Sequence, residues 1–150
     1  MAAPPSSEGE TQHQRLLWFV RTFEINRSKR AKALHSAHAL LMEVDLRIAF
    51  VSGAWISSII LACVAIEADL RQIEKLNYQA KAVELFGKDK DLHWLRELRN
   101  EILHAREPGT KSAIWQVEGH DIASTHEALE QSARRAIEIM FFRIYNKSET

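Results

Sequence analysis

Apolar residues at intervals of three or four positions extend through the middle of the chain, from Leu34 through Leu41, Val44 and Ile48 to Ile73. These intervals place the residues along one face of an α-helix, whereas a half-buried strand would alternate at every second position. The pattern is too long for one straight helix in a domain of 150 residues. Ser52 and Gly53 interrupt it with residues of lower helix propensity. We therefore expect two consecutive helices with a break or kink at Ser52–Gly53.

The central part of this pattern raises a membrane alternative. Residues 48–66 contain no charged side chain and are long enough to span a bilayer as a helix. However, several serines interrupt the segment, and neither an aromatic belt nor a one-sided basic flank accompanies it. A helix that is apolar on all sides can equally lie at the centre of a helical bundle. We expect the buried helix and keep the membrane span as the alternative.

Further helical patterns lie on both sides of this run. Ser7 and Glu10 have the spacing of a capping box, and the helix expected after them has one apolar face: Leu16, Leu17, Val20 and Phe23. Residues 79–86 predict a short helix closed by Gly87. Ser124 and Glu127 form a second capping-box pattern. The amphipathic pattern after it is the most regular in the chain: Leu129, Ala133, Ala136, Ile137, Met140, Phe141 and Ile144.

Together these patterns predict an all-α, up-and-down bundle of four main helices with a short additional helix. We expect residues 1–8 to be a disordered tail and residues 9–150 to be a single domain. The polar N-terminus lacks the basic and apolar regions of a secretory signal. Cys63, the only cysteine, lies in an apolar run, which indicates a reducing, cytoplasmic setting. The net charge of zero excludes a global field that would attract nucleic acid.

Residues 95–105 are the candidate functional element. We expect them to form one helix, capped by Asp89 or Asp91. On a helical wheel, one side is apolar and should face the core: Trp94, Leu95, Leu98, Ile102 and Ala105. The other side has a different mixture: Arg96, Arg99, Asn100, Leu103 and His104. A purely structural helix would more usually have Lys and Glu there, so this mixture suits a half-buried polar cleft.

These side chains suit cleavage of a phosphodiester. The imidazole of His104 can give or take a proton near neutral pH. The guanidinium of Arg99 offers a fork of donors that matches phosphate oxygens, and the amide of Asn100 can orient either group. A ribose 2′-hydroxyl could then attack the adjacent phosphodiester without a metal or a cofactor. The spacing alone leaves a structural reading open, because a cation such as His104 is favoured in the last turn of any helix.

Residues 98–104, Leu-Arg-Asn-Glu-Ile-Leu-His, resemble the Arg-x(4–6)-His signature of the HEPN superfamily in its Arg-Asn-x-x-x-His form. Residues 65–70 are similar to the earlier core helix of that family, which often carries an acidic residue near the motif. The resemblance covers residues 48–105. It implies an α-helical bundle that dimerises, so that two copies of the motif form one composite site.

The resemblance also implies an activity. Many members of the family are metal-independent endoribonucleases in toxin–antitoxin, phage-defence or RNA-processing systems. On this carry-over, Arg99 and His104 are the catalytic pair, and Asn100 supports them. Glu67 would orient Arg99, and Arg96 would assist at the same face. The expected partners are RNA and a second copy of the chain, and an antitoxin protein is allowed.

One alternative remains beside this interpretation and the membrane span. The chain could be a non-catalytic HEPN-like module for dimerisation or for binding a nucleic acid or nucleotide. The toxin branch of the family with a modifiable tyrosine is a poorer match, because Arg106 stands two residues after His104, where that branch has the tyrosine. Arg106 could instead contact a phosphate. A metal site is not expected, since His35 and His38 share a helical face without a third ligand nearby.

Overall fold

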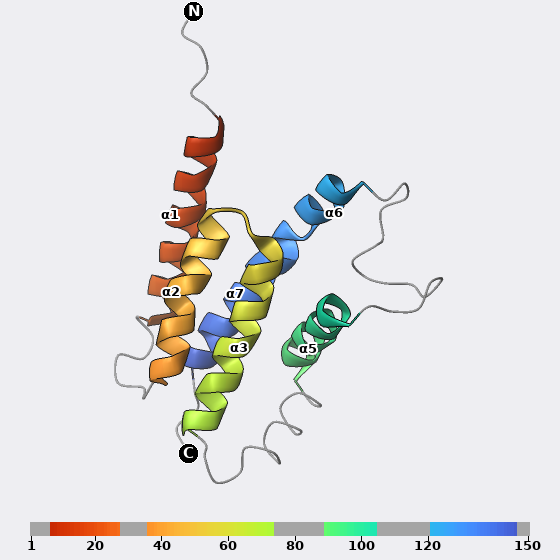
Figure 1. Ribbon diagram of the computed structural model, residues 1–150. Coiled ribbons are helices and arrows are strands. Elements are labelled where there is room, and N and C mark those ends of the chain that lie inside the picture. Colours follow the sequence, from red (N-terminus) through yellow and green to blue (C-terminus); the bar gives the residue numbers. More distant parts are fainter. Residues whose placement is uncertain (1–6, 28–35, 74–88, 105–120, 147–150) are drawn as a thin grey trace, which may run out of the picture.

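The computed structural model describes residues 7–27, 36–73, 89–104 and 121–146, and the account below concerns these residues. They form six α-helices and, within these ranges, no strand (Figure 1). The helices are α1 (Ser7–Arg27), α2 (Ala37–Val51), α3 (Trp55–Ile73), α5 (Lys90–Leu103), α6 (Ile122–Ala128) and α7 (Glu130–Tyr145). The predicted all-α class is confirmed. The expected short helix at residues 79–86 and Arg106 lie outside the described residues, as does most of the expected tail.

The predicted break between the two central helices is confirmed. α2 ends at Val51 and α3 begins at Trp55. Between them Gly53 has a φ of 82°, a left-handed conformation that glycine adopts without steric cost. The Nη1 of Arg15 in α1 donates to the carbonyl oxygen of Val51 at 3.2 Å, which ties the end of α2 to α1. The break folds α3 back along α2, so that the two helices lie side by side (Figure 1).

This turn supports a prediction about stability. Replacing Gly53 with alanine should lower the free energy of unfolding by about 1–2 kcal/mol, because an alanine side chain is strained in the left-handed region. Gly53→Asn should lower the free energy of unfolding by less, since asparagine tolerates the left-handed conformation better than alanine does. Urea denaturation of the two variants would measure the difference. Equal losses for alanine and asparagine would contradict a conformational cause and point to contact with Arg15, whose Nη1 would lie 3.2 Å from an added Cβ.

α3 and α7 form the centre of the packing. α3 packs against α2 and α7, and α1 packs against α2 and α7. The buried residues of α7 include six of those predicted from its amphipathic pattern: Ala133, Ala136, Ile137, Met140, Phe141 and Ile144. None of the described helices combines the length and hydropathy that crossing a membrane requires.

The predicted apolar face of α2 is wrong, and that of α1 is confirmed only for Phe23, which packs against the core. In α2, the expected stripe is exposed, with Leu41 at 64% and Ile48 at 61%. Ala39, Leu46 and Phe50 are buried in its place. In α1 the fully packed side chain is Phe19 at 3% exposure, whereas the predicted face exposes much of Leu16, Leu17 and Val20. Aromatic packing explains which face of α2 is buried, because Phe50 contacts the rings of Trp18, Phe19 and Trp55.

The predicted capping box at Ser124 is also wrong. Asp121 caps α6 by accepting from the backbone N–H of Ala123 at 3.1 Å. Ser124 lies inside the first turn and donates its hydroxyl to Asp121 Oδ2 at 2.7 Å. An aspartate three positions earlier therefore provides the cap that the sequence pattern assigned to Ser124. The helix consequently begins one turn before the position expected.

Candidate functional site

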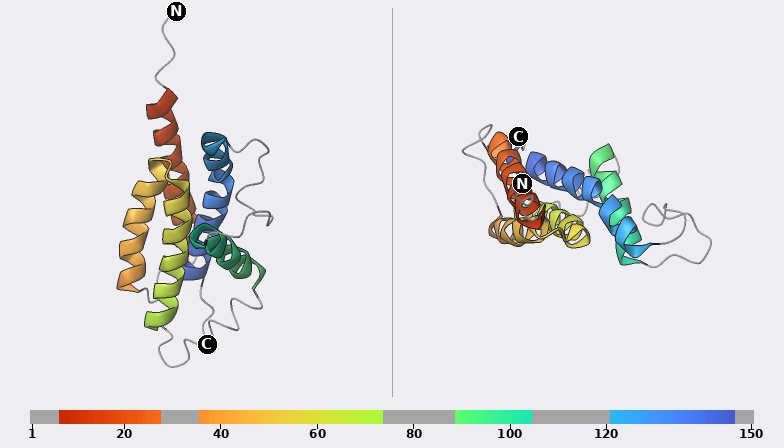
Figure 2. Two further views of the ribbon diagram at one scale, coloured as in Figure 1. Left: turned by 45° about the vertical axis from the view of Figure 1, so that its right-hand side comes forward. Right: turned by 90° about the horizontal axis from the view of Figure 1, so that it is seen from above.

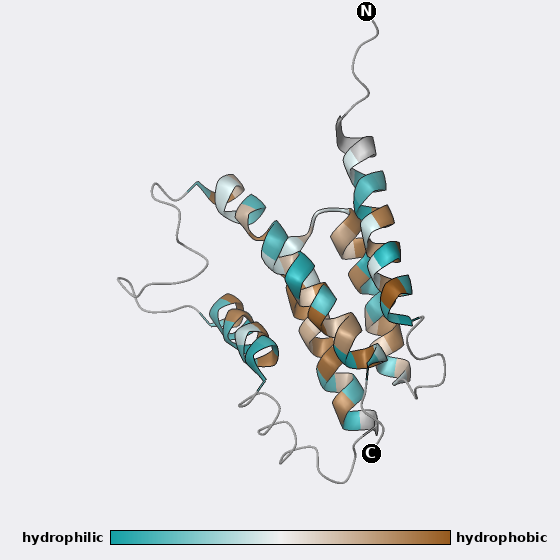
Figure 3. Ribbon diagram, turned by 180° about the vertical axis from the view of Figure 1, so that it is seen from behind, coloured by the Kyte–Doolittle hydropathy of each residue, from teal (hydrophilic) through white to brown (hydrophobic). Residues whose placement is uncertain are grey.

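α5 lies beside α3 and α7 and is set at an angle to both (Figure 2). Its start is defined by Asp89, whose Oδ1 accepts from the backbone N–H groups of Asp91 at 2.9 Å and Leu92 at 3.0 Å. Cap formation by Asp89 is thus confirmed. Leu92, Leu95 and Leu98 are buried, as the apolar side of the wheel predicted for the last two. Coloured by hydropathy, the ribbon of α5 alternates between hydrophilic and hydrophobic residues (Figure 3).

Arg99 is held against α3. Its Nη1 forms an ion pair with Oε1 of Glu67 and lies 3.8 Å from Sγ of Cys63. The thiol of Cys63 lies 3.9 Å from the same Glu67 oxygen. Cys63 and Glu67 are one turn apart on α3, so together they form a seat for the guanidinium. The structure thus brings Arg99 together with Glu67, the residue that the family resemblance assigned to orienting it.

The electrostatics of this seat keep Arg99 charged and Cys63 neutral. Partial burial acts to lower the pKa of Arg99, but the contacts with Cys63 and Glu67 outweigh it, so the pKa lies above its ordinary value. Burial raises the pKa of the Cys63 thiol, and together with the charge of Glu67 it outweighs the downward effect of Arg99. The thiol therefore stays protonated at neutral pH. Cys63 was not predicted as a neighbour of the site, although its i,i+4 spacing from Glu67 is visible in the sequence.

His104 lies just beyond the end of α5. The helix ends at Leu103, and His104 is the C-cap, with extended dihedral angles (φ −116°, ψ 115°). The expectation that residues 95–105 form one helix is therefore wrong at its C-terminal end. The backbone N–H of His104 still donates to the carbonyl oxygen of Asn100 at 2.9 Å, but its imidazole is exposed to solvent. In the described part of the chain, no side-chain hydrogen bond joins His104 to Arg99.

The remaining predicted residues have different surroundings. Asn100 is half-buried, and Arg96 is exposed on the outer side of α5. Arg106 and His35 lie outside the described residues. Within the ranges that the structure describes, no group of three or more His, Cys, Asp or Glu side chains is placed to hold a metal ion.

The arrangement provides two chemical functions at one end of α5. Glu67 engages one nitrogen of Arg99, and a guanidinium has further N–H donors that could bind a phosphate oxygen. The side chain of Arg99 is 29% exposed, so these donors are within reach of solvent. His104 offers an accessible imidazole for proton transfer. One end of α5 thus has an arginine held by an ion pair and a solvent-exposed imidazole.

No protein-family model, curated protein or solved structure matches this chain. The resemblance of residues 98–104 and 65–70 to the HEPN superfamily therefore stays an expectation, and the structure adds that Arg99 and Glu67 bring these two segments into contact.

Proposed function

We propose that this protein is a metal-independent endoribonuclease of the HEPN type, with a composite site formed by two copies of the chain. One observation carries the proposal: Glu67 fixes the guanidinium of Arg99 on α3, while His104, five positions along the chain, leaves its imidazole in solvent. The described helices would then belong to a HEPN-like bundle, and toxin or phage-defence action would be its biological setting.

The reaction follows from the two side chains. The ribose 2′-oxygen attacks the adjacent phosphorus, and one His104 imidazole accepts the proton of the 2′-hydroxyl. The bond from phosphorus to the 5′-oxygen breaks, and the second His104, contributed by the other copy, donates a proton to that oxygen. Arg99 stabilises the charge that develops on the phosphoryl oxygens, and Asn100 supports it. The products are a 2′,3′-cyclic phosphate and a 5′-hydroxyl.

Two identical copies related by a two-fold axis place the same residues opposite each other. The exposure of His104 is consistent with this arrangement, because the second copy can bring its own histidine to the shared phosphate. A reducing compartment also fits, since Cys63 is a buried free thiol. We therefore assign the activity to the cytoplasm.

Cleavage of single-stranded RNA in the presence of EDTA tests this function. We expect purified protein to cut an RNA oligonucleotide and to leave a 2′,3′-cyclic phosphate, detected by mass spectrometry. The matched control is the same oligonucleotide with 2′-deoxyribose at each position that is cut, which should stay intact because it lacks the nucleophile. Cleavage of the deoxy substrate, or a requirement for a divalent metal, would refute the mechanism.

A non-catalytic module is the second candidate. The observation in its favour is that Arg99 and His104 form no side-chain hydrogen bond within one chain, as in a site that binds a phosphate without cleaving it. This candidate predicts that RNA or a nucleotide binds with an affinity that falls in Arg99→Ala, while the RNA stays intact. Binding measured beside the cleavage assay separates the two candidates.

A further inference from the structure

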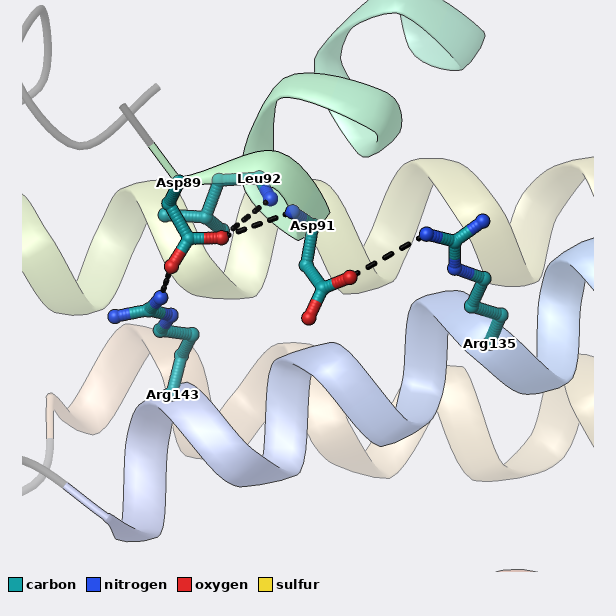
Figure 4. Close-up of polar contacts among 5 residues, drawn as sticks. All are labelled: Asp89, Asp91, Leu92, Arg135 and Arg143. Atoms are coloured by element: carbon teal, nitrogen blue, oxygen red, sulfur yellow. Dashed lines mark hydrogen bonds and ion pairs between the residues drawn. The ribbon is translucent and has the colours of Figure 1, made fainter. Parts of the chain in front are cut away.

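The N-terminal end of α5 is attached to α7 by charged side chains that the proposed reaction does not use. Oδ2 of Asp89 forms an ion pair with Arg143, while Oδ1 of the same carboxylate caps α5 (Figure 4). Asp91 accepts from Arg135 at 3.3 Å. The guanidinium of Arg135 also lies 4.0 Å from the ring centroid of Trp94 in α5. Two arginines of α7 therefore engage the first turns of the helix that carries the motif.

Few buried side chains hold α5 in its position. It buries three side chains, all leucines, whereas α7 buries eight residues. An element with few buried apolar contacts opens locally at a lower free energy than the core does. Its position against α3 is therefore sensitive to contacts at its ends. At the C-terminal end the contact is Arg99 with Glu67, and at the N-terminal end it is Asp89 with Arg143.

We propose that Arg143 is a positioning residue for the motif, acting through Asp89, with Arg135 and Asp91 in a supporting role. Asp89 precedes Arg99 by ten positions, about 15 Å along a rigid helix. Fixing Asp89 to α7 thus fixes where Arg99 meets α3. This inference rests on the proposed function for its effect on catalysis, but its effect on α5 can be measured without RNA.

The surroundings of the Asp89–Arg143 ion pair favour a moderate effect of this pair on the position of α5. An open cavity of about 490 Å³ lies beside it, lined among others by Asp91, Arg135, Glu138 and Arg143. Arg143 and Asp89 keep 31% and 21% of their side chains exposed, so solvent weakens the pair without removing it. Partial burial lowers the pKa of Arg143, yet an arginine remains protonated at neutral pH. Glu138 is a further carboxylate lining this cavity.

Asp89→Asn and Arg143→Gln test the coupling. Asparagine caps a helix about as well as aspartate, so Asp89→Asn removes the charge and keeps the cap. We expect each variant to speed amide hydrogen exchange in α5 by about three- to tenfold, and to leave exchange in α3 unchanged. The double variant should be no worse than either single one, because both remove the same pair. Arg134→Gln is the control, since Arg134 pairs with Glu130 inside α7 and not with α5.

A second measurement reports on the C-terminal end of α5, where Arg99 contacts Glu67. In NMR spectra the guanidinium of Arg99 should rotate slowly in the wild type and faster in Arg143→Gln, because the seat on Glu67 loosens. The corresponding kinetic change is a fall in kcat of about three- to tenfold with KM unchanged. Unchanged exchange in α5, or additive effects of the two substitutions, would overturn the inference. Wild-type protein that does not cleave RNA would refute the proposed function alone, because exchange and NMR still decide whether Arg143 positions the helix.

Discussion

His104→Ala should lower the rate of RNA cleavage about 10²–10⁴-fold, the usual contribution of a general acid or base. The substitution removes the imidazole that the proposed mechanism uses as general acid and base. Its effect should fall on kcat rather than KM, because the imidazole acts on the transferring protons more than on the bound phosphate. Stability should change little, since the side chain is exposed. Single-turnover cleavage at saturating protein would measure the rate.

The matched control is His93→Ala. His93 is likewise an exposed histidine, but it lies in the first turn of α5, six positions before Arg99. The His93→Ala variant should cleave RNA at the wild-type rate. Arg99→Ala should be as damaging as His104→Ala, and the double variant should fall little further, because groups that serve one transition state are not additive. Equal losses for His93→Ala and His104→Ala would contradict a specific role for His104.

The sequence predicted which segments are helical better than it predicted which faces they bury. α2 illustrates the reason. Leu41, Val44 and Ile48 follow helical spacing as well as Leu46 and Phe50 do, so periodicity alone permits either face toward the core. The choice depends on partners from other helices, because Phe50 fits among the rings of Trp18, Phe19 and Trp55. Shape complementarity of this kind is absent from a one-dimensional pattern.

In the candidate site too, the helix pattern could be predicted from the sequence, whereas the contacts between helices could not. The two faces of α5 could be predicted, since its leucines recur at helical spacing. The contact between Arg99 and Glu67 joins α5 to α3 across 32 positions of sequence, so only the family resemblance suggested it. The end of the helix at Leu103 had no local signal, because neither glycine nor proline stands at positions 104–106. The partners of Asp89 and Asp91 on α7 could not be predicted either, because they also lie far away along the sequence.

Phe141→Ala should lower the free energy of unfolding by about 3–5 kcal/mol, the usual cost of deleting a buried phenylalanine ring. Phe141 is fully buried on α7. Its ring centroid lies 5.2 Å from that of Phe19 and 5.8 Å from that of Phe23, both in α1. The truncated side chain would leave a cavity between α7 and α1 that neighbouring helices can fill only in part. Such a loss is a large share of the 5–15 kcal/mol that stabilises a typical domain.

Phe142→Ala provides the control at the next position. Phe142 is 52% exposed on the same helix, so its truncation should cost less than about 1 kcal/mol. Urea denaturation followed by circular dichroism would measure both variants, at several protein concentrations. Similar losses for the two variants at every concentration would contradict the orientation of α7. A loss for Phe142→Ala that grows with protein concentration would instead show that copies associate through Phe142, because a dimer is stabilised by mass action and a monomer is not.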